Sequence, residues 1–406
     1  MISVHNKALA ETITVERILG KVEGTTNGPT VVFFCGIHGN ETSGVFALNE
    51  IFEKLNANLV HGTVYGILGN LKALQEHIRY KDQDLNRLWT KEQIKKTKEK
   101  FILNTEEVEQ LALLELLKSI IKSHSGPFYF VDLHSTSSYS LPFITINDAL
   151  INRRFSKQFP VPIVLGIEEY LNGALLSYIN QLGYVSLGFE SGQHDAADAV
   201  NNSIAFTYLT LVYSGVLNKE SLPNFSTYYK QLEAQSQNTF DFFEIVYLHS
   251  IHPKDSFKMY NGFKSFQDIK KGTVLAVNNG VVLKSDYNAK IFMPLYQNKG
   301  VDGYFIIKRI RPVFLVISAL LRRLKMDSLL ILLPGISWLD KKEGILKVNL
   351  NIARFFAKSI FHVLGYRSKQ ITLNSLQLNN RERVAKTAMY KKKWWYKNKR
   401  DYSANV

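Results

Sequence analysis

Three apolar, β-favouring runs in this chain each end in side chains that can bind a metal or move a proton. Val31 to Phe34 leads to His38 and Glu41, Phe128 to Val131 leads to Asp132 and His134, and Tyr184 to Phe189 leads to Glu190. Runs of this composition predict buried strands. Because ligand sites in open α/β sheets lie at the carboxyl ends of strands, three such strand ends predict one shared site.

Hydrophobic periodicity predicts a strand over 63–68 and helices over about 43–56, 104–123 and 199–216 between and after these runs. A polar loop with little periodicity occupies 77–90. Alternating strands and helices indicate βαβ units and a mostly parallel sheet. The expected fold class is therefore α/β, with a mostly parallel or mixed sheet flanked by helices.

The sequence pattern changes after the last of these helices. From about 243 to 310, short β-favouring segments alternate with glycine turns, which indicates a small all-β barrel or sandwich. The rest is predicted to be a mainly helical, basic extension, amphipathic over 312–333, with the apolar face packed onto the protein. The predicted domains are a catalytic domain at 1–225, a β domain at 240–310 and the extension at 311–406.

The net charge of +15 belongs wholly to the C-terminal region. Residues 311–406 hold 20 Lys and Arg against 5 Asp and Glu, whereas residues 1–310 hold 30 of each kind. The neutral main body argues against a nucleic-acid-binding role for it. Lys391 to Lys393 with Trp394 and Trp395 could attract an anionic lipid surface or nucleic acid. The alternative is a solvated helical extension that covers the β domain or a second subunit.

Cysteine usage and hydropathy bear on the compartment. The single cysteine, Cys35, excludes an intrachain disulfide and is consistent with a reducing compartment. The first ten residues lack the apolar segment of a secretory signal. The apolar stretch at 313–338 is interrupted by charges and by Pro334-Gly335, and falls short of the roughly 20 residues that span a bilayer. We therefore expect a cytoplasmic protein without a transmembrane segment.

Four motifs, in order, resemble those of the succinylglutamate desuccinylase/aspartoacylase family, relatives of the zinc carboxypeptidases, across about 30–310. They are Gly36-Ile37-His38-Gly39-Asn40-Glu41, the segment from Arg79 to Asp84-Leu85-Asn86-Arg87, Asp132-Leu133-His134, and Glu190-Ser191-Gly192. The resemblance implies a zinc carboxypeptidase-like fold and one Zn²⁺ per chain, held by His38, Glu41 and His134. These are the ligand types of a catalytic zinc site, which keeps one position open.

The resemblance also implies roles for the other motif residues. Glu190 becomes the general base and Arg79 the stabiliser of the oxyanion formed from the substrate carbonyl. Asn86 and Arg87 would hold a substrate carboxylate, and Asp84 and Asp132 would orient neighbouring groups. A tyrosine of the β domain would reach the site: Tyr296 is the first candidate, with Tyr287 and Tyr304 as alternatives. His194 fits a surface loop at least as well as a site role.

The predicted function is that of a zinc-dependent amidohydrolase, a deacylase of an N-acyl amino acid or similar small acyl amide. Aspartoacylases use a further arginine before the catalytic glutamate's strand, but the stretch 168–178 here has none and contains Glu168 and Glu169. A dianionic N-acylaspartate is therefore disfavoured, and a neutral or cationic substrate feature is favoured. The alternatives are a zinc carboxypeptidase on short peptides and a binding protein acting through the basic tail. A homo-oligomer is compatible with the sequence.

Overall fold

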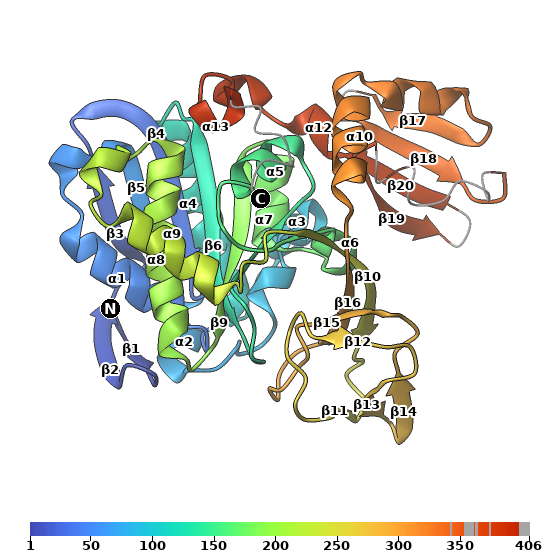
Figure 1. The fold of residues 1–406 in the computed structure, drawn as a ribbon, viewed down its shortest axis with the longest axis horizontal. Helices are drawn as coiled ribbons and strands as arrows, with labels where there is room; N and C mark the ends of the chain where they lie inside the picture. The colour runs from blue at the N-terminus through green and yellow to red at the C-terminus, as the bar shows by residue number, and fades with distance from the viewer. Residues whose placement is uncertain (342, 353–360, 362–363, 373–374, 398–406) are drawn as a thin grey trace.

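The computed structural model describes residues 1–341, 343–352, 361, 364–372 and 375–397 (Figure 1). The strands are β1 (Ile2–Asn6), β2 (Glu11–Val15), β3 (Ile18–Glu23), β4 (Thr26–Cys35), β5 (His61–Leu68), β6 (Phe128–Thr136), β7 (Phe143–Ile146), β8 (Ile163–Leu165), β9 (Val185–Gln193), β10 (Phe242–Ser250), β11 (Phe257–Met259), β12 (Asp268–Ile269), β13 (Val274–Asn278), β14 (Val281–Lys284), β15 (Ala289–Phe292), β16 (Asp302–Arg309), β17 (Ile336–Asp340), β18 (Ile345–Asn349), β19 (Tyr366–Thr372) and β20 (Ser375–Asn380).

The helices of the described residues connect these strands. The α-helices are α1 (Ser43–Lys54), α2 (Leu71–Glu76), α3 (Lys91–Glu99), α4 (Thr105–Ser123), α5 (Leu150–Ser156), α6 (Ile167–Tyr170), α7 (Leu175–Gln181), α8 (Ala197–Ser214), α9 (Phe225–Gln235), α10 (Pro312–Arg323), α12 (Arg381–Val384) and α13 (Trp394–Lys397). Short 3-10 helices are η1 (Ala57–Leu59), η2 (Leu85–Arg87), η3 (Lys219–Ser221), η4 (Met326–Leu332) and η5 (Thr387–Tyr390).

One mixed sheet runs through the molecule in the strand order β12-β15-β16-β10-β8-β7-β9-β6-β4-β5-β3. At its centre β4 pairs in parallel with both β5 and β6, and β6 pairs in parallel with β9. The expected α/β fold class with a mixed sheet is thereby confirmed. The three long helices expected from periodicity are present, with ends shifted by at most two residues, as α1, α4 and α8.

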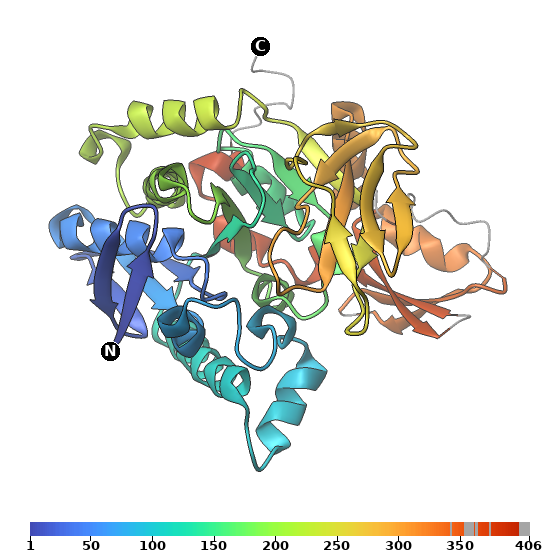
Figure 2. The same cartoon turned by 90° about the horizontal axis from the view of Figure 1, so that it is seen from below.

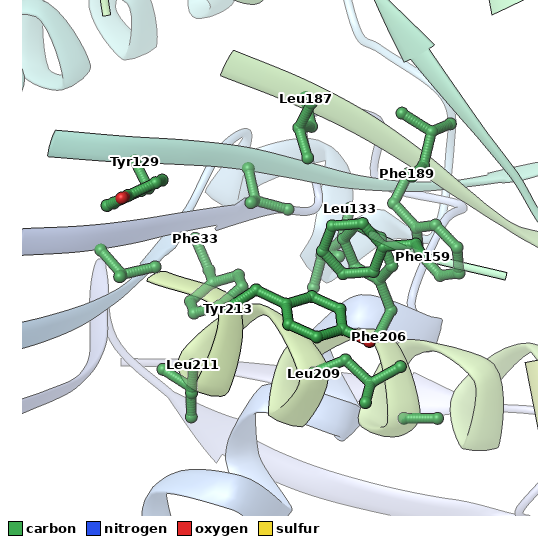
Figure 3. Packing of buried hydrophobic residues seen from close by; sticks show 14 of the residues in the cluster. Phe33, Tyr129, Leu133, Phe159, Leu187, Phe189, Phe206, Leu209, Leu211 and Tyr213 are labelled. Atoms are coloured by element: carbon green, nitrogen blue, oxygen red, sulfur yellow. The ribbon is translucent and has the colours of Figure 1, made fainter. Parts of the chain in front are cut away.

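Both faces of the central sheet are covered, because its strands alternate two apolar faces. In β4, Val31, Phe33 and Cys35 belong to one core cluster, and Val32 and Phe34 to another. The first cluster packs under α1, α5 and α8; part of it, with Phe159, Phe189 and Phe206 close together, is shown in Figure 3. The second packs under α3, α4 and α7. In Figure 2 these two helix layers lie on opposite sides of the sheet, as βαβ connections require.

The region from 242 to 309 contains the predicted short strands, and it is joined to the main sheet. β10 pairs in parallel with β8 and antiparallel with β16, so that the large sheet continues into this region. A second sheet, in the order β11-β13-β14, packs on its end through a shared apolar core that includes Met259, Leu275, Ile291 and Tyr304. The arrangement is therefore a two-sheet sandwich built onto the edge of the catalytic sheet.

The prediction of a mainly helical C-terminal region is wrong. After α10 and η4, the chain forms a four-stranded antiparallel sheet in the order β17-β18-β20-β19 (Figure 1). In β18, Leu346 and Val348 are buried and Lys347 is exposed, which is the two-residue period of a strand. The parts of the expected helical extension at 353–360 and 398–406 lie outside the described residues.

The basic tail returns to the catalytic domain and completes its core. Trp395 is buried, its ring packs 5.2 Å from that of Phe155, and its Nε1 donates to the Tyr129 hydroxyl at 3.2 Å. The Tyr390 hydroxyl donates to the Phe128 carbonyl at 2.5 Å and accepts from the Val185 amide at 3.0 Å. Tyr390 thus bridges the amino ends of β6 and β9.

Truncating Trp395 should destabilise the catalytic domain strongly. We expect Trp395→Ala to lower the free energy of unfolding by about 3–5 kcal/mol, because it removes a fully buried aromatic side chain. Trp394→Ala is the matched control, since Trp394 is 43% exposed and should cost less than about 1 kcal/mol. Urea unfolding followed by circular dichroism measures both; equal midpoints for the two variants would contradict the packing role.

Candidate active site

The pairing of three parallel strands places the predicted site residues at one edge of the sheet. In the register, Cys35 of β4 lies beside Leu133 of β6, and His134 lies beside Glu190 of β9. The loop that follows Cys35 therefore extends over the carboxyl end of β6. This is the edge at which ligands bind in open α/β sheets.

Two glycines give the loop after β4 the sharp path it needs. Gly36 has a φ of +64°, a left-handed conformation that side chains other than glycine rarely adopt. Gly39 approaches the backbone of Ala73 in α2 so closely that a Cβ atom has no room. The Gly39 amide also donates to the carbonyl of Arg79 at 3.2 Å. The loop that carries His38 and Glu41 is thereby held against the segment that carries Arg79.

His38, Glu41 and His134 converge in the buried interior of this edge. The two Glu41 oxygens lie 2.8 Å from His38 Nδ1 and 2.9 Å from His134 Nδ1. One ligand atom from each residue lies within 4.8 Å of the others, and all three residues are buried. Two imidazoles and a carboxylate at this separation suit a divalent ion of the zinc type.

The outer nitrogens of both histidines face further carboxylates. His38 Nε2 lies 3.1 Å from Asp84 Oδ1, and His134 Nε2 lies 2.8 Å from Asp132 Oδ2. A carboxylate behind a histidine is the usual support of a metal-binding imidazole. Burial lowers the pKa of His134, but the charges of Asp132 and Glu41 outweigh it and hold that pKa well above its ordinary value. A metal ion that binds to this cluster would therefore displace its protons.

Arg79 and Glu190 flank the three-residue cluster. Arg79 donates to Glu41 Oε1 and to Asp84 Oδ2, both at 3.2 Å, while its Nε is buried and has no hydrogen-bond partner among the described residues. Glu190 is buried, and its Oε2 likewise has no partner within the described part of the chain. Burial raises the pKa of Glu190 to about 8, against the lowering influence of His134 and Arg79.

A cavity of about 120 Å³ opens beside these groups and is lined by them. Asn86 and Arg87 also line it, and Asn86 Oδ1 accepts from the Leu175 amide at 2.8 Å. Arg87 donates to Asp302 at 2.6 Å, and both side chains are about one-fifth exposed. The guanidinium expected to bind a substrate carboxylate is thus already paired with an acidic group of β16.

The expected tyrosine does not line this cavity. The Tyr296 hydroxyl donates to the Tyr260 carbonyl at 2.8 Å and accepts from the Phe263 amide at 3.0 Å, so it supports a turn of the β region. Tyr287 and Tyr304 are absent from the lining as well. The β region instead lines it with Met293, Leu295, Gln297, Gly300, Asp302 and Phe305.

Two further lining residues follow the predicted motifs directly. His194 lines the cavity, and its Nδ1 lies 2.8 Å from the hydroxyl of Ser135. The Ser135 amide also donates to Glu41 Oε2 at 3.2 Å. Their proximity in sequence to Glu190 and His134 was the available signal. Asp302 offered no such signal, because it meets Arg87 from 215 positions away.

Comparisons with known proteins agree with this fold. The sequence model of the "Succinylglutamate desuccinylase/Aspartoacylase catalytic domain" matches residues 27–210. A succinylglutamate desuccinylase/aspartoacylase structure from Rhodobacter sphaeroides is 16% identical, covers 74% of this chain and 91% of its own, and has a TM-score of 0.55. Succinylglutamate desuccinylase structures from Vibrio parahaemolyticus (14% identity, coverage 74% and 90%) and Silicibacter sp. (14%, 71% and 87%) both have TM-scores of 0.51.

Other observations add limits to these matches. No curated protein sequence matches this chain. Identities of 14–16% establish a shared fold but do not identify the substrate of this chain. Among the residues that the structure describes, no helix has the length and apolar character needed to cross a membrane. The matched region nevertheless contains His38, Glu41, Arg79, Arg87, His134 and Glu190. Residues 27–210 therefore match the catalytic domain of the succinylglutamate desuccinylase/aspartoacylase family.

Proposed function

We propose that this protein is a zinc-dependent amidohydrolase that removes the acyl group of an N-acyl amino acid or a similar small acyl amide. The observation that carries the proposal is the buried group of His38, Glu41 and His134 with Glu190 on the adjacent strand. A zinc ion bound by these three residues would polarise the amide carbonyl and lower the pKa of a water molecule to about 7. The family match supports deacylase chemistry in general.

Glu190 is the proposed general base and acid. Its carboxylate takes a proton from the water whose oxygen bonds to the carbonyl carbon, and returns that proton to the nitrogen as the C–N bond breaks. A carboxyl group with a pKa near 8 in its buried surroundings holds a proton readily at the second of these steps. The positive charge of a nearby cation lowers this pKa and favours the first step.

Arg79 is the proposed stabiliser of the oxyanion. Its guanidinium is fixed by Glu41 and Asp84, and its Nε keeps one donor without a partner in the described part of the chain. A positioned donor that points at developing charge loses no energy to reorientation during the reaction.

The cavity favours a small substrate. Its volume of about 120 Å³ lies below the roughly 300–1,000 Å³ of pockets for drug-sized ligands. Its lining beyond the catalytic groups includes Leu171, Leu176 and Phe305 together with Glu168 and Asp302. Because Arg87 pairs with Asp302, Glu168 is the lining carboxylate that opposes a second carboxylate on the substrate, and the apolar walls suit an uncharged acyl group better. A short peptide, the substrate of a carboxypeptidase, fits this volume less well.

Removing the carboxylate of Glu190 should leave the metal site intact and abolish most turnover. We expect Glu190→Gln to retain about one zinc per chain while kcat falls about a hundredfold or more, as the loss of a general base does. Zinc is measured by plasma mass spectrometry and turnover by released amine. Glu115→Gln, on the exposed side of α4, is the control and should behave as the parent protein. Full activity of Glu190→Gln would exclude it as the base.

Removing one predicted ligand should remove the metal. We expect His134→Ala to bind zinc at least about tenfold more weakly than the parent chain, because one of three protein ligands is lost. Competition with a fluorescent zinc chelator measures the affinity without reference to activity. His252→Ala changes an exposed histidine of the β region and should leave the affinity unchanged. Equal affinities for all three proteins would contradict the proposed ligand set.

Arg87 should act on substrate binding. We expect Arg87→Lys and Arg87→Ala to raise KM while kcat changes little, because the planar guanidinium that grips a carboxylate is lost. Initial rates on acetyl, succinyl and longer acyl amino acids give both constants. An unchanged KM would remove Arg87 from the carboxylate role. Chromatography of the products separates the two enzyme classes: a free acyl acid supports the deacylase, and a released C-terminal residue supports the carboxypeptidase.

A further inference from the structure

Helix α10 presents its large apolar side chains to solvent. Six of them, on the outer face of the helix and just after it, are each at least 42% exposed: Val313, Phe314, Val316, Ile317, Leu320 and Leu324. The following η4 adds Leu329, Ile331 and Leu332, of which Leu332 is 76% exposed. The expectation that the apolar face of 312–333 packs onto the protein is therefore confirmed for Leu315, Ala319 and Leu330 and wrong for these nine exposed residues. An apolar surface of this extent on a folded protein marks an interaction site.

The inward face of α10 explains this orientation. It consists of Leu315, Ser318, Ala319 and Arg322, all buried. Arg322 donates to Asp148 Oδ2 at 2.8 Å and to Glu382 Oε1 at 3.2 Å. Turning the helix over would break both ion pairs of Arg322, leaving Asp148 with Arg153 and removing the cation from Glu382. The ion pairs therefore keep the apolar residues outside.

A cationic cavity of about 920 Å³ lies at the carboxyl end of α10. Among the described residues that line it are seven cations and two acidic residues, and Arg322 and Arg383 pair with the acidic Glu382 and Asp327. The other five have no ion pair with an acidic group of the described residues: Arg154, Arg323, Lys325, Lys341 and Lys391. Six of the seven cations come from the segment that carries the whole net charge of +15. Five cations around one cavity with no ion pair to the described residues create a strong attraction for anions.

The combination of apolar helix and cationic cavity selects one kind of partner. A second copy of this chain would bring the same excess of positive charge against the first, so that like charges would oppose pairing. Nucleic acid would satisfy the cations, but its phosphate backbone offers nothing to cover nine aliphatic or aromatic side chains. An anionic lipid bilayer offers both acidic headgroups and an apolar interior.

We propose that α10 and η4 form a membrane-docking surface that lies in the plane of an anionic phospholipid bilayer. The apolar side chains from Val313 to Leu332 enter the region below the headgroups, and Arg323, Lys325 and Lys391 meet the lipid phosphates. The helix is 12 residues long and lies along the surface rather than across it, as an interfacial amphipathic helix does. The protein is thereby recruited to a membrane through a helix that lies on its surface.

Sedimentation of the full chain with lipid vesicles tests the proposal. The probes are phosphatidylcholine vesicles and phosphatidylcholine vesicles that contain about one-third phosphatidylglycerol. We expect binding to the anionic vesicles that is at least about tenfold tighter than to the neutral ones and that weakens as salt rises from about 0.1 to 1 M. Equal binding to both vesicles, or none to either, would overturn the proposal.

Two triple variants separate the apolar and cationic contributions. Replacing Phe314, Leu320 and Leu324 with Ser should weaken binding to anionic vesicles at least about tenfold, because three apolar side chains no longer leave water. Replacing Arg323, Lys325 and Lys391 with Gln should remove the preference for anionic lipid. Because all six side chains are exposed, both variants should fold and keep the parent rate of hydrolysis.

Matched controls remove the same groups elsewhere. One control replaces Val274, Val281 and Val282 with Ser, and the other replaces Lys258, Lys270 and Lys284 with Gln. All six are exposed residues of the β region, so both controls should bind vesicles as the parent chain does. Wild-type binding by the Phe314 triple variant would overturn the proposal. So would a parent dimer, seen by analytical ultracentrifugation, that the same variant converts to a monomer without any vesicle binding.

Discussion

The register of three parallel strands is the constraint on which the rest of this structure depends. Because β4, β6 and β9 pair side by side in one direction, residues that are about 150 positions apart reach the same edge of the sheet. A shift of one residue in any strand would turn its polar end to the opposite face. The apolar alternation within β4 and β6 prevents that shift, since each face has its own core. Packing energy therefore determines the geometry of the site.

The charges at that edge depend on one another in the same way. Glu41 is buried between two imidazoles and Arg79, and Asp84 and Asp132 lie behind those imidazoles. Burying several carboxylates together is unfavourable unless cations compensate them. The chain supplies these cations from histidine and arginine, and a divalent ion is the further cation that this donor set fits. The cluster thus combines a structural requirement for positive charge with a geometry suited to metal binding.

The sequence predicted the parts of the molecule in which local pattern and tertiary role coincide. The strand ends that carry His38, His134 and Glu190 could be predicted, because ligand sites in open α/β sheets lie at the carboxyl ends of strands. Contacts between segments that are far apart in the sequence could not be predicted from local patterns. Asp302 meets Arg87 only because β16 continues the main sheet, and Tyr296 fails to reach the cavity because a turn of its own region holds its hydroxyl. The four-stranded C-terminal sheet was not predicted, because its strands of 5 to 7 residues contain few repeats of the two-residue period.

Hydrophobic periodicity alone could not predict whether the apolar face of helix α10 points to the interior or to solvent. The pattern over 312–333 identifies two faces of a helix, and the usual preference of apolar groups for the interior then assigns the apolar face inward. That preference amounts to about 25 cal/mol per Å² of apolar surface. It competes here with the ion pairs that Arg322 forms with Asp148 and Glu382. Arg322 lies on the opposite face from Leu320 and Leu324, so one helix cannot satisfy both demands. In the structure the ion pairs of Arg322 are formed and the apolar side chains are exposed. The exposed apolar surface is therefore available to a partner outside the chain.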